Sequence, residues 1–151
     1  MPTTFTNQAT LSYNNQLIPS NVVTGVLTEV LSVSKTAIPA AYQNGDTITY
    51  AVQLVNSGTA ALTGLTLTDN LGAYTPAAGT AAVVPMTYQS DTLRYYRNGI
   101  LQATPTIAAT SPLTVTGLSI PAGGNTTLMY AVKANQFTPY GAEESVTNTA
   151  T

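Results

Sequence analysis

Side chains that could do chemistry are scarce in this sequence of 151 residues. It contains no His and no Cys, so the usual ligands of zinc, copper and iron–sulfur centres are missing. A Ser-His-Asp triad and a Cys nucleophile are excluded for the same reason. We therefore expect no metal site and no cofactor that depends on these side chains.

The six acids are the remaining candidates for catalysis or ion binding, and only Glu143 and Glu144 are adjacent. Neighbouring residues on a strand face opposite sides, so this pair would not flank one scissile bond. The same pair, and Asp46 with Asn44, offer oxygen ligands to calcium, but neither has the spacing of an EF-hand loop. The acids therefore favour a protein that is not an enzyme.

One group of side chains suits ligand binding. Asp91, Arg94 and Arg97 lie around the pair Tyr95-Tyr96, a combination that could recognise a sugar or an anion. Charges on an exposed edge strand explain the same residues, because such charges oppose further strand pairing. The alternation of a strand also places Arg94 and Tyr96 on the opposite face from Tyr95 and Arg97.

The charge and hydropathy of the chain exclude further classes of protein. Four basic residues and a net charge of −2 cannot form the basic surface of a nucleic-acid-binding protein. No apolar run approaches the length of a membrane-spanning helix. The first residues, Met-Pro-Thr-Thr-Phe-Thr-Asn, lack the basic and apolar regions of a secretory signal. A secreted protein with this sequence would have lost its signal or would leave the cell by another route.

The elements that must position these residues are strands. Alternating polar and apolar residues, separated by Gly, Pro and Asn turns, predict a β-sandwich with no helix longer than a turn. Asn98-Gly99 gives the strongest hairpin signal, and residues 72–88 read as a long irregular segment. The expected strands are Thr47–Val55, Leu62–Thr68, Leu93–Arg97, Ile100–Leu101, Leu113–Ile120, Thr126–Lys133 and Ser145–Ala150.

The first third of the chain is organised differently. Phe5–Tyr13 and Val22–Val33 are expected to be two strands joined by a loop over residues 14–20. A two-stranded ribbon is marginal in water and must pack on something.

A short repeat links this ribbon to the end of the chain. Phe5–Thr10 matches Val146–Thr151 as apolar-Thr-Asn-x-Ala-Thr. The match could arise by chance in a chain rich in Thr and Ala. The alternative is that both segments fit the same structural position.

Several blocks of sequence, in order, point to a known family: Leu31–Ala37, Asn44–Tyr50, Asn56–Thr59, Leu67–Gly72, Pro121–Tyr130 and Val146–Ala150. They resemble the repeat called domain of unknown function eleven, which occurs in bacterial surface and spore-associated proteins. The resemblance covers Leu31 to Thr151 and implies an immunoglobulin-like β-sandwich, 31–151, preceded by an arm or hairpin, 1–30.

Members of this family often form tandem arrays, whereas this chain has one full copy behind what looks like the tail of another. The resemblance therefore implies head-to-tail assembly, in which the arm of one subunit adds a strand to the sandwich of the next. The alternative is an arm folded back on its own sandwich. The expected donor strand presents Phe5, Asn7, Ala9, Leu11 and Tyr13.

The sequence also resembles the isopeptide-forming domains of fimbrial subunits. Those domains carry a Lys on an early strand, an Asn on the last strand and an acid between them, and Lys35, Asp69 and Asn148 occupy such positions. The resemblance implies attack of a neutral Lys35 amine on the Asn148 carboxamide, polarised by Asp69. Asn7 is the alternative partner. A solvated Lys35, a turn role for Asp69 and a capping role for Asn148 explain the same residues.

Together these features predict a structural protein: an identical subunit of a head-to-tail filament on a cell or spore surface. The alternative is a monomeric surface-displayed module that adheres to a ligand or carbohydrate, with residues 72–88 as its recognition loop. Neither function involves a cofactor, nucleic acid or a membrane span.

Overall fold

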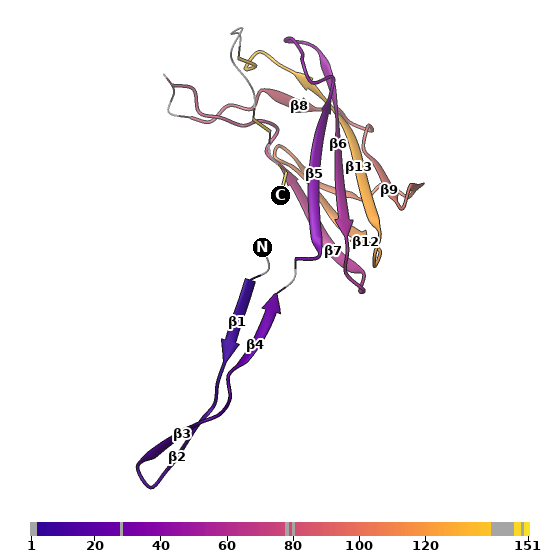
Figure 1. Ribbon diagram of the computed structural model, residues 1–151. Helices are drawn as coiled ribbons and strands as arrows, with labels where there is room; N and C mark the ends of the chain where they lie inside the picture. Colours follow the sequence, from indigo (N-terminus) through magenta and orange to yellow (C-terminus); the bar gives the residue numbers. More distant parts are fainter. Residues whose placement is uncertain (1–2, 28, 78, 80, 140–146, 149) are drawn as a thin grey trace. The chain divides into compact units, whose positions relative to one another are not determined.

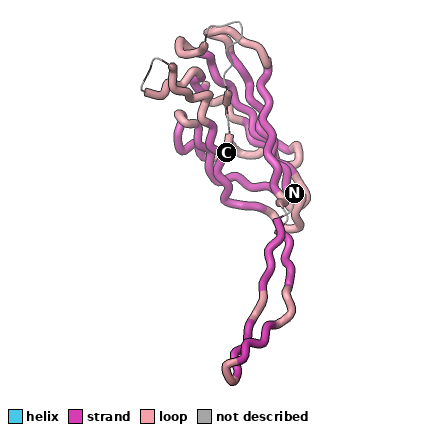
Figure 2. Tube along the Cα trace, turned by 60° about the vertical axis from the view of Figure 1, so that its left-hand side comes forward, coloured by secondary structure: helices cyan, strands magenta, loops and turns pink. Residues whose placement is uncertain are grey.

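The computed structural model describes residues 3–27, 29–77, 79, 81–139, 147–148 and 150–151. These residues form strands and loops, and none of them is helical (Figure 2). The chain divides into two compact units, Met1–Val30 and Leu31–Thr151.

The second unit contains two antiparallel sheets (Figure 1). The first sheet has the order β10-β9-β13-β6-β5, with β8 paired to the end of β13, and the second has the order β11-β12-β7. The strands of the second unit are β5 (Leu31–Ile38), β6 (Thr47–Asn56), β7 (Leu62–Asp69), β8 (Met86–Tyr88), β9 (Arg94–Arg97), β10 (Ile100–Leu101), β11 (Thr106–Thr110), β12 (Leu113–Ile120) and β13 (Asn125–Ala134).

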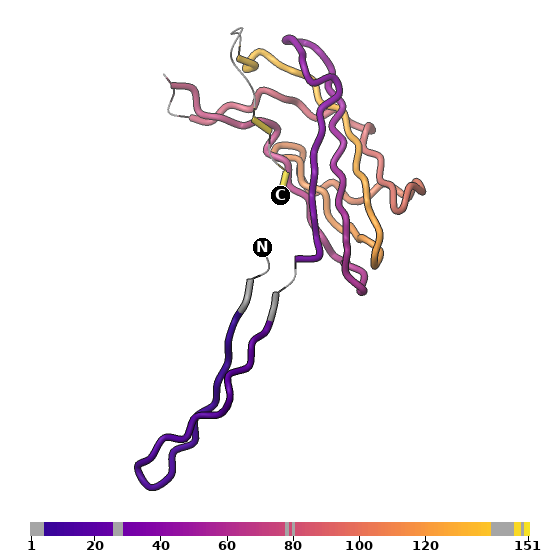
Figure 3. The backbone as a smooth tube through the Cα atoms, viewed as in Figure 1, coloured from indigo at the N-terminus to yellow at the C-terminus, as the bar shows by residue number. Residues whose placement is uncertain are grey.

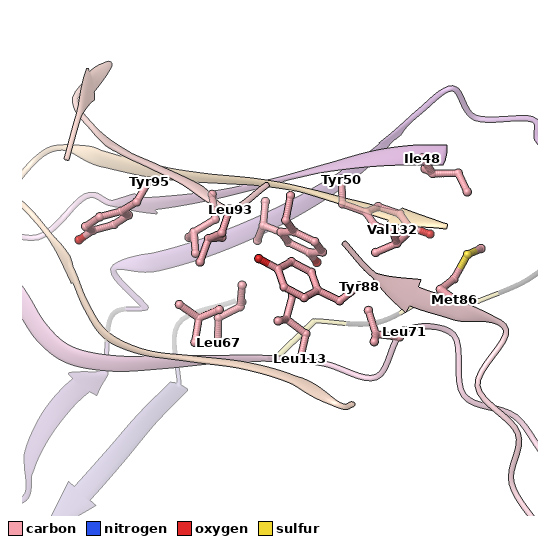
Figure 4. Packing of buried hydrophobic residues seen from close by; sticks show 14 of the residues in the cluster. Ile48, Tyr50, Leu67, Leu71, Met86, Tyr88, Leu93, Tyr95, Leu113 and Val132 are labelled. Carbon is pink, nitrogen blue, oxygen red and sulfur yellow. The ribbon is translucent and has the colours of Figure 1, made fainter. Parts of the chain in front are cut away.

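The core lies between the two sheets because every second residue of the long strands is apolar. In β6 the even-numbered residues from Ile48 to Leu54 are buried, and β13 alternates in the same way. In β12 the alternation shifts by one residue at Gly117, where the pairing with β7 is irregular. Figure 4 shows side chains from both sheets meeting, with Tyr50 and Val132 facing Leu67 and Leu113. The long strands of the sandwich are therefore as the alternation predicts.

Turn residues set the connection between β9 and β10. Asn98 and Gly99 have φ values of 47° and 78°, as this hairpin requires.

Two strands of the second unit were not expected. Residues 72–88 include β8 and a bridge between Tyr74 and Val83, and the Ala-rich segment after β10 includes β11. Both strands are too short or too rich in Ala for alternation to reveal them.

The first unit is a twisted ribbon of four strands, β1 (Thr3–Asn7), β2 (Thr10–Tyr13), β3 (Gln16–Pro19) and β4 (Val23–Leu27). β1 pairs with β4 and β2 pairs with β3, so the chain runs out along β1 and β2 and returns along β3 and β4 (Figure 3).

The two strands expected here are wrong in detail. Phe5–Tyr13 is interrupted after Asn7, and the expected loop over residues 14–20 contains β3. Asn14 and Asn15 have φ values of 48° and 60°, so two residues suffice to turn the chain. Asn tolerates this left-handed conformation better than most residues.

The expected strand Val22–Val33 is also wrong, because its alternation continues across a change of partner. Val23–Leu27 pairs with β1, whereas Leu31 begins β5, which pairs with β6. Alternation reveals which face of a strand is apolar but not which strand lies beside it.

Candidate functional site

Lys35 and Asp69 meet between the edge strands of the two sheets. Lys35 lies on β5 opposite Val52, on the face that turns toward the core, and Asp69 ends β7. The Lys35 Nζ atom is 2.7 Å from Asp69 Oδ2, and the two side chains are 13% and 0% exposed. The sandwich therefore buries an ion pair at this point.

Tyrosine side chains complete the surroundings of this pair. Tyr130 donates a short hydrogen bond from its hydroxyl to Asp69 Oδ2. Lys35 Nζ lies 4.2 Å from the centre of the Tyr50 ring, a cation–π geometry. The Leu71 backbone N–H donates to Asp69 Oδ1 at 2.9 Å. Both carboxylate oxygens of Asp69 are thus hydrogen-bonded.

Burial changes the proton affinities at this site. It lowers the pKa of Lys35, although the hydrogen bond and the charge of Asp69 oppose the change. Burial and the Asp69 charge raise the pKa of Tyr130. A lysine with a lowered pKa is more often a neutral amine, which is the nucleophilic form.

The Asn148 side chain belongs to the same neighbourhood. Its Oδ1 atom accepts a hydrogen bond of 3.2 Å from the Gly72 N–H, close in sequence to Asp69. Its Nδ2 atom is buried and has no partner in hydrogen-bond geometry among the described residues. Burial raises the pKa of Tyr50 and the Asn148 amide opposes this change, so the amide lies near the Tyr50 hydroxyl. We call Lys35, Asp69, Tyr50, Tyr130 and Asn148 the Lys35 cluster.

The segment that carries Asn148 pairs with β7. Ala150 forms an antiparallel bridge with Asp69, and Thr68 and Thr151 exchange backbone hydrogen bonds of 2.7 and 2.8 Å. The expected strand Ser145–Ala150 lies partly outside the described residues.

The two tyrosines of the cluster were not named as site residues, because their places in alternating strands indicate only a core position. Tyr50 and Tyr130 stand directly opposite each other on β6 and β13, with their rings 5.9 Å apart. One property of these residues could have pointed to the site, because a tyrosine hydroxyl that is buried needs a polar partner.

The predicted donor residues lie in the first unit. Asn7 ends β1 opposite Val23, and the Ala9 backbone N–H bonds to Ser20 Oγ. Phe5, Leu11 and Tyr13 are 62%, 64% and 65% exposed.

The predicted sugar- or anion-binding residues do not share one face. Tyr95 is buried and its hydroxyl donates to the Ser119 carbonyl, while Arg97 contacts Ser119 and Gln102. Asp91, Arg94 and Tyr96 instead line an open hollow of about 340 Å³.

Of the two segments considered for calcium, the structure describes only the turn that contains Asp46. Asp46 Oδ2 accepts the Gln43 N–H within its own turn, and Glu143 and Glu144 lie outside the described residues. No three acidic side chains gather within the described ranges. No helix long and apolar enough to cross a bilayer occurs there either.

Comparison with known proteins gives likeness in structure alone. No family model and no curated protein matches the chain. The pilus backbone (RrgB) of Streptococcus pneumoniae aligns over 70% of this chain with a TM-score of 0.52 and 11% identity. AvmM, which catalyses macrocyclization in alchivemycin A biosynthesis, aligns over 85% of this chain and 72% of its own with a TM-score of 0.40 and 13% identity.

The alignment spans 46% of the pilus backbone chain. Together with the two antiparallel sheets, it identifies the fold as the all-β, immunoglobulin-like sandwich that the sequence predicts.

Proposed function

We propose that this protein is a structural subunit, without enzymatic activity, that assembles head to tail into a filament on a cell or spore surface. The observation that carries the proposal is the exposed apolar surface of the first unit. Its strands form two sheets of two strands each, and seven large apolar side chains among its described residues are exposed (Phe5, Leu11, Tyr13, Leu17, Ile18, Val22 and Val23). Such a ribbon gains stability when a partner covers it.

A second copy of the chain supplies that partner. An extended arm that adds to a sheet edge gains main-chain hydrogen bonds, and its alternate side chains enter the core of the acceptor. The arm and the acceptor are different surfaces, so the contact is heterologous and extends into a filament unless rotation closes a ring.

Two likenesses support this proposal. The sequence blocks of the second unit resemble domain of unknown function eleven, to which we assign residues 31–151. The fold of these residues is also that of a pilus backbone, a surface structure. Surface localisation and identical partners follow from the proposal.

The Lys35 cluster provides a covalent lock. Transfer of a proton from Lys35 Nζ to Asp69 within the ion pair leaves a neutral amine. This amine attacks the side-chain carbonyl carbon of an asparagine, and the proton now on Asp69 polarises the carbonyl. A new C–N bond forms, the bond to the carboxamide nitrogen breaks, and ammonia leaves with the displaced proton. Asn148 stands at the cluster, and Asn7 is its counterpart in the arm.

Deletion of residues 1–20 tests the assembly. The shortened chain should keep the sandwich, measured by circular dichroism, and should form no filaments in negative-stain electron microscopy. The full chain at the same concentration should form filaments one subunit wide. Uniform small particles from the full chain would favour the adhesion module, and filaments from the shortened chain would exclude donation by the arm.

Mass spectrometry tests the lock. Each bond makes the product one ammonia lighter, so an unchanged mass in both monomer and polymer would refute it. Lys35→Met should abolish the loss of ammonia, and Lys133→Met, at an exposed position of β13, should not.

A further inference from the structure

The outer edge of β7 is paired at one end only. β12 occupies its inner edge, and Thr68 and Asp69 bond to Thr151 and Ala150 on the other. From Leu62 to Leu67, no described strand pairs with that outer edge. The unpaired N–H and C=O groups there can accept another strand.

The core is also open beside this edge. Leu31 and Val33 precede Lys35 on the core-facing side of β5, yet they are 40% and 50% exposed. Leu65 and Leu67 precede Asp69 on the core-facing side of β7. Lys35 contacts Asp69, so β5 and β7 approach each other at that point. The exposed side chains of Leu31 and Val33 leave a gap in the cover of the core on this side, next to β7, where Leu65 is half-buried and Leu67 is buried.

The sequence repeat supplies the occupant and its register. The repeat aligns Asn7 with Asn148 and Ala9 with Ala150. Since Ala150 lies opposite Asp69, a strand in that register continues past Asp69 along β7. It places Leu11 opposite Leu67 and Tyr13 opposite Leu65.

We propose that this edge of β7 is the acceptor site for residues 7–13 of a second copy, in the register that sets Ala9 opposite Asp69. This inference rests on the proposed function and specifies its interface. The arriving strand displaces the segment that carries Asn148 and puts Asn7 into the Lys35 cluster.

The chemistry of the arm fits this gap. In the proposed register Asn7, Ala9, Leu11 and Tyr13 face inward, and the Thr and Ser residues between them face solvent. Leu11 and Tyr13 are 64% and 65% exposed in the free arm and would cover the gap. Thr10 of the arm therefore takes the place of Thr151 in the backbone hydrogen bonds with Thr68, and the arm extends further along β7.

The covalent step then joins two subunits. Lys35 Nζ of one copy bonds to Asn7 Cγ of the next, the Cγ–Nδ2 bond of Asn7 breaks, and one ammonia leaves. The Asn148 carboxamide remains intact in the assembled filament.

Engineered cysteines test the register, because the chain has no Cys of its own. Thr68 and Thr151 are a hydrogen-bonded pair, so Tyr13 and Leu65 would be a non-hydrogen-bonded pair, with Cα atoms about 4.5 Å apart. This spacing suits a disulfide. A mixture of the Tyr13→Cys and Leu65→Cys chains should cross-link on oxidation.

The matched control replaces Leu65→Cys with Thr66→Cys, one residue along β7 and on the opposite face. We expect its cross-linking with Tyr13→Cys to be about tenfold slower or absent, because the Cβ atoms point apart. Equal rates for the two mixtures, or a faster control, would overturn the register.

Peptide mapping of the unmodified chain gives a second measurement that does not depend on a variant folding. The polymer should contain a peptide joining Lys35 to Asn7. A Lys35–Asn148 peptide in the polymer would overturn the displacement. Filaments without the Tyr13–Leu65 cross-link would refute the register and leave the proposed function standing, whereas a full chain that never assembles would refute both.

Discussion

At the scale of single residues, the Lys35 cluster holds Asp69, the one acidic side chain that is buried among the described residues. Asp69 is fully buried and accepts from Lys35, Tyr130 and the Leu71 N–H. A buried carboxylate with three donors satisfies the requirement that buried polar groups be hydrogen-bonded. Removing one member of a buried ion pair leaves the other uncompensated, which costs more than the pair contributes.

The first prediction compares the cost of removing Asp69 with the cost of removing the Lys35 charge. Asp69→Ala should lower the free energy of unfolding by about 3–5 kcal/mol, because it leaves Lys35 and the Tyr130 hydroxyl without their shared acceptor. Lys35→Met should cost less, because Asp69 keeps two donors and the stem remains apolar. Urea denaturation measures both.

Lys133→Met is the control for these variants, because Lys133 is exposed. It should change the free energy of unfolding by no more than about 0.5 kcal/mol. An Asp69→Ala protein as stable as this control would show that the ion pair has no structural role.

The second prediction concerns pH. Burial raises the pKa of Tyr130 above its ordinary value of 10.0, so the unfolded chain loses this proton at lower pH than the folded chain. The contribution of the protonated Tyr130 hydroxyl to the free energy of unfolding is fully present below pH 10 and is lost as the pH rises above it. This group alone should lower stability by up to about 1.4 kcal/mol per pH unit.

Urea denaturation at about pH 9 and about pH 11 measures this slope. Tyr130→Phe removes the ionisable group, so the slope between the two pH values should become shallower. An unchanged slope would mean that Tyr130 makes no contribution to it.

At the scale of elements, turns decide how neighbouring strands pair. Gly99 has a φ of 78° between β9 and β10, and a Cβ there would meet no atom within 4 Å. A Cβ atom at position 99 therefore has room, and what limits substitution there is the backbone conformation, which L residues with a Cβ disfavour.

The third prediction follows from this turn. Gly99→Ala should lower the free energy of unfolding by about 1 kcal/mol, because Ala resists the left-handed conformation. Gly79→Ala is the control, since Gly79 lacks a positive φ and a Cβ there would make ordinary contacts of 3.5 Å. Equal effects in urea denaturation would contradict the account.

At the scale of the whole molecule, the two units differ in what holds them together. Residues 31–151 enclose one core of buried side chains, whereas the ribbon exposes its large apolar residues. Hydrophobic burial dominates folding, so most of the stability belongs to the second unit.

The fourth prediction tests this division. A peptide of residues 1–30 should be largely unfolded in isolation, because two-stranded ribbons are marginal in water. Residues 31–151 expressed alone should keep dispersed amide signals in two-dimensional NMR spectra. A well-dispersed spectrum from the short peptide would contradict the expectation.

Sequence alone was sufficient for the long strands of the sandwich and for one hairpin. Alternation in segments such as Thr47–Val55 predicted the long strands, and Asn98-Gly99 predicted its hairpin, because side-chain period and turn conformation depend on neighbouring residues. The lack of His and Cys limits the possible chemistry whatever fold the chain adopts. Lys35, Asp69 and Asn148 were named from a resemblance, which gave residue types and order but no distances.

The tertiary structure decided which of these residues meet. It brought Lys35 to Asp69 across 34 positions of sequence and added Tyr50 and Tyr130, whose alternation had indicated only a core position. It also separated Val23–Leu27 from β5 by giving each a different partner. Strand pairing and sheet packing join residues far apart in the chain, and the period-two pattern of a strand is the same whichever partner it takes.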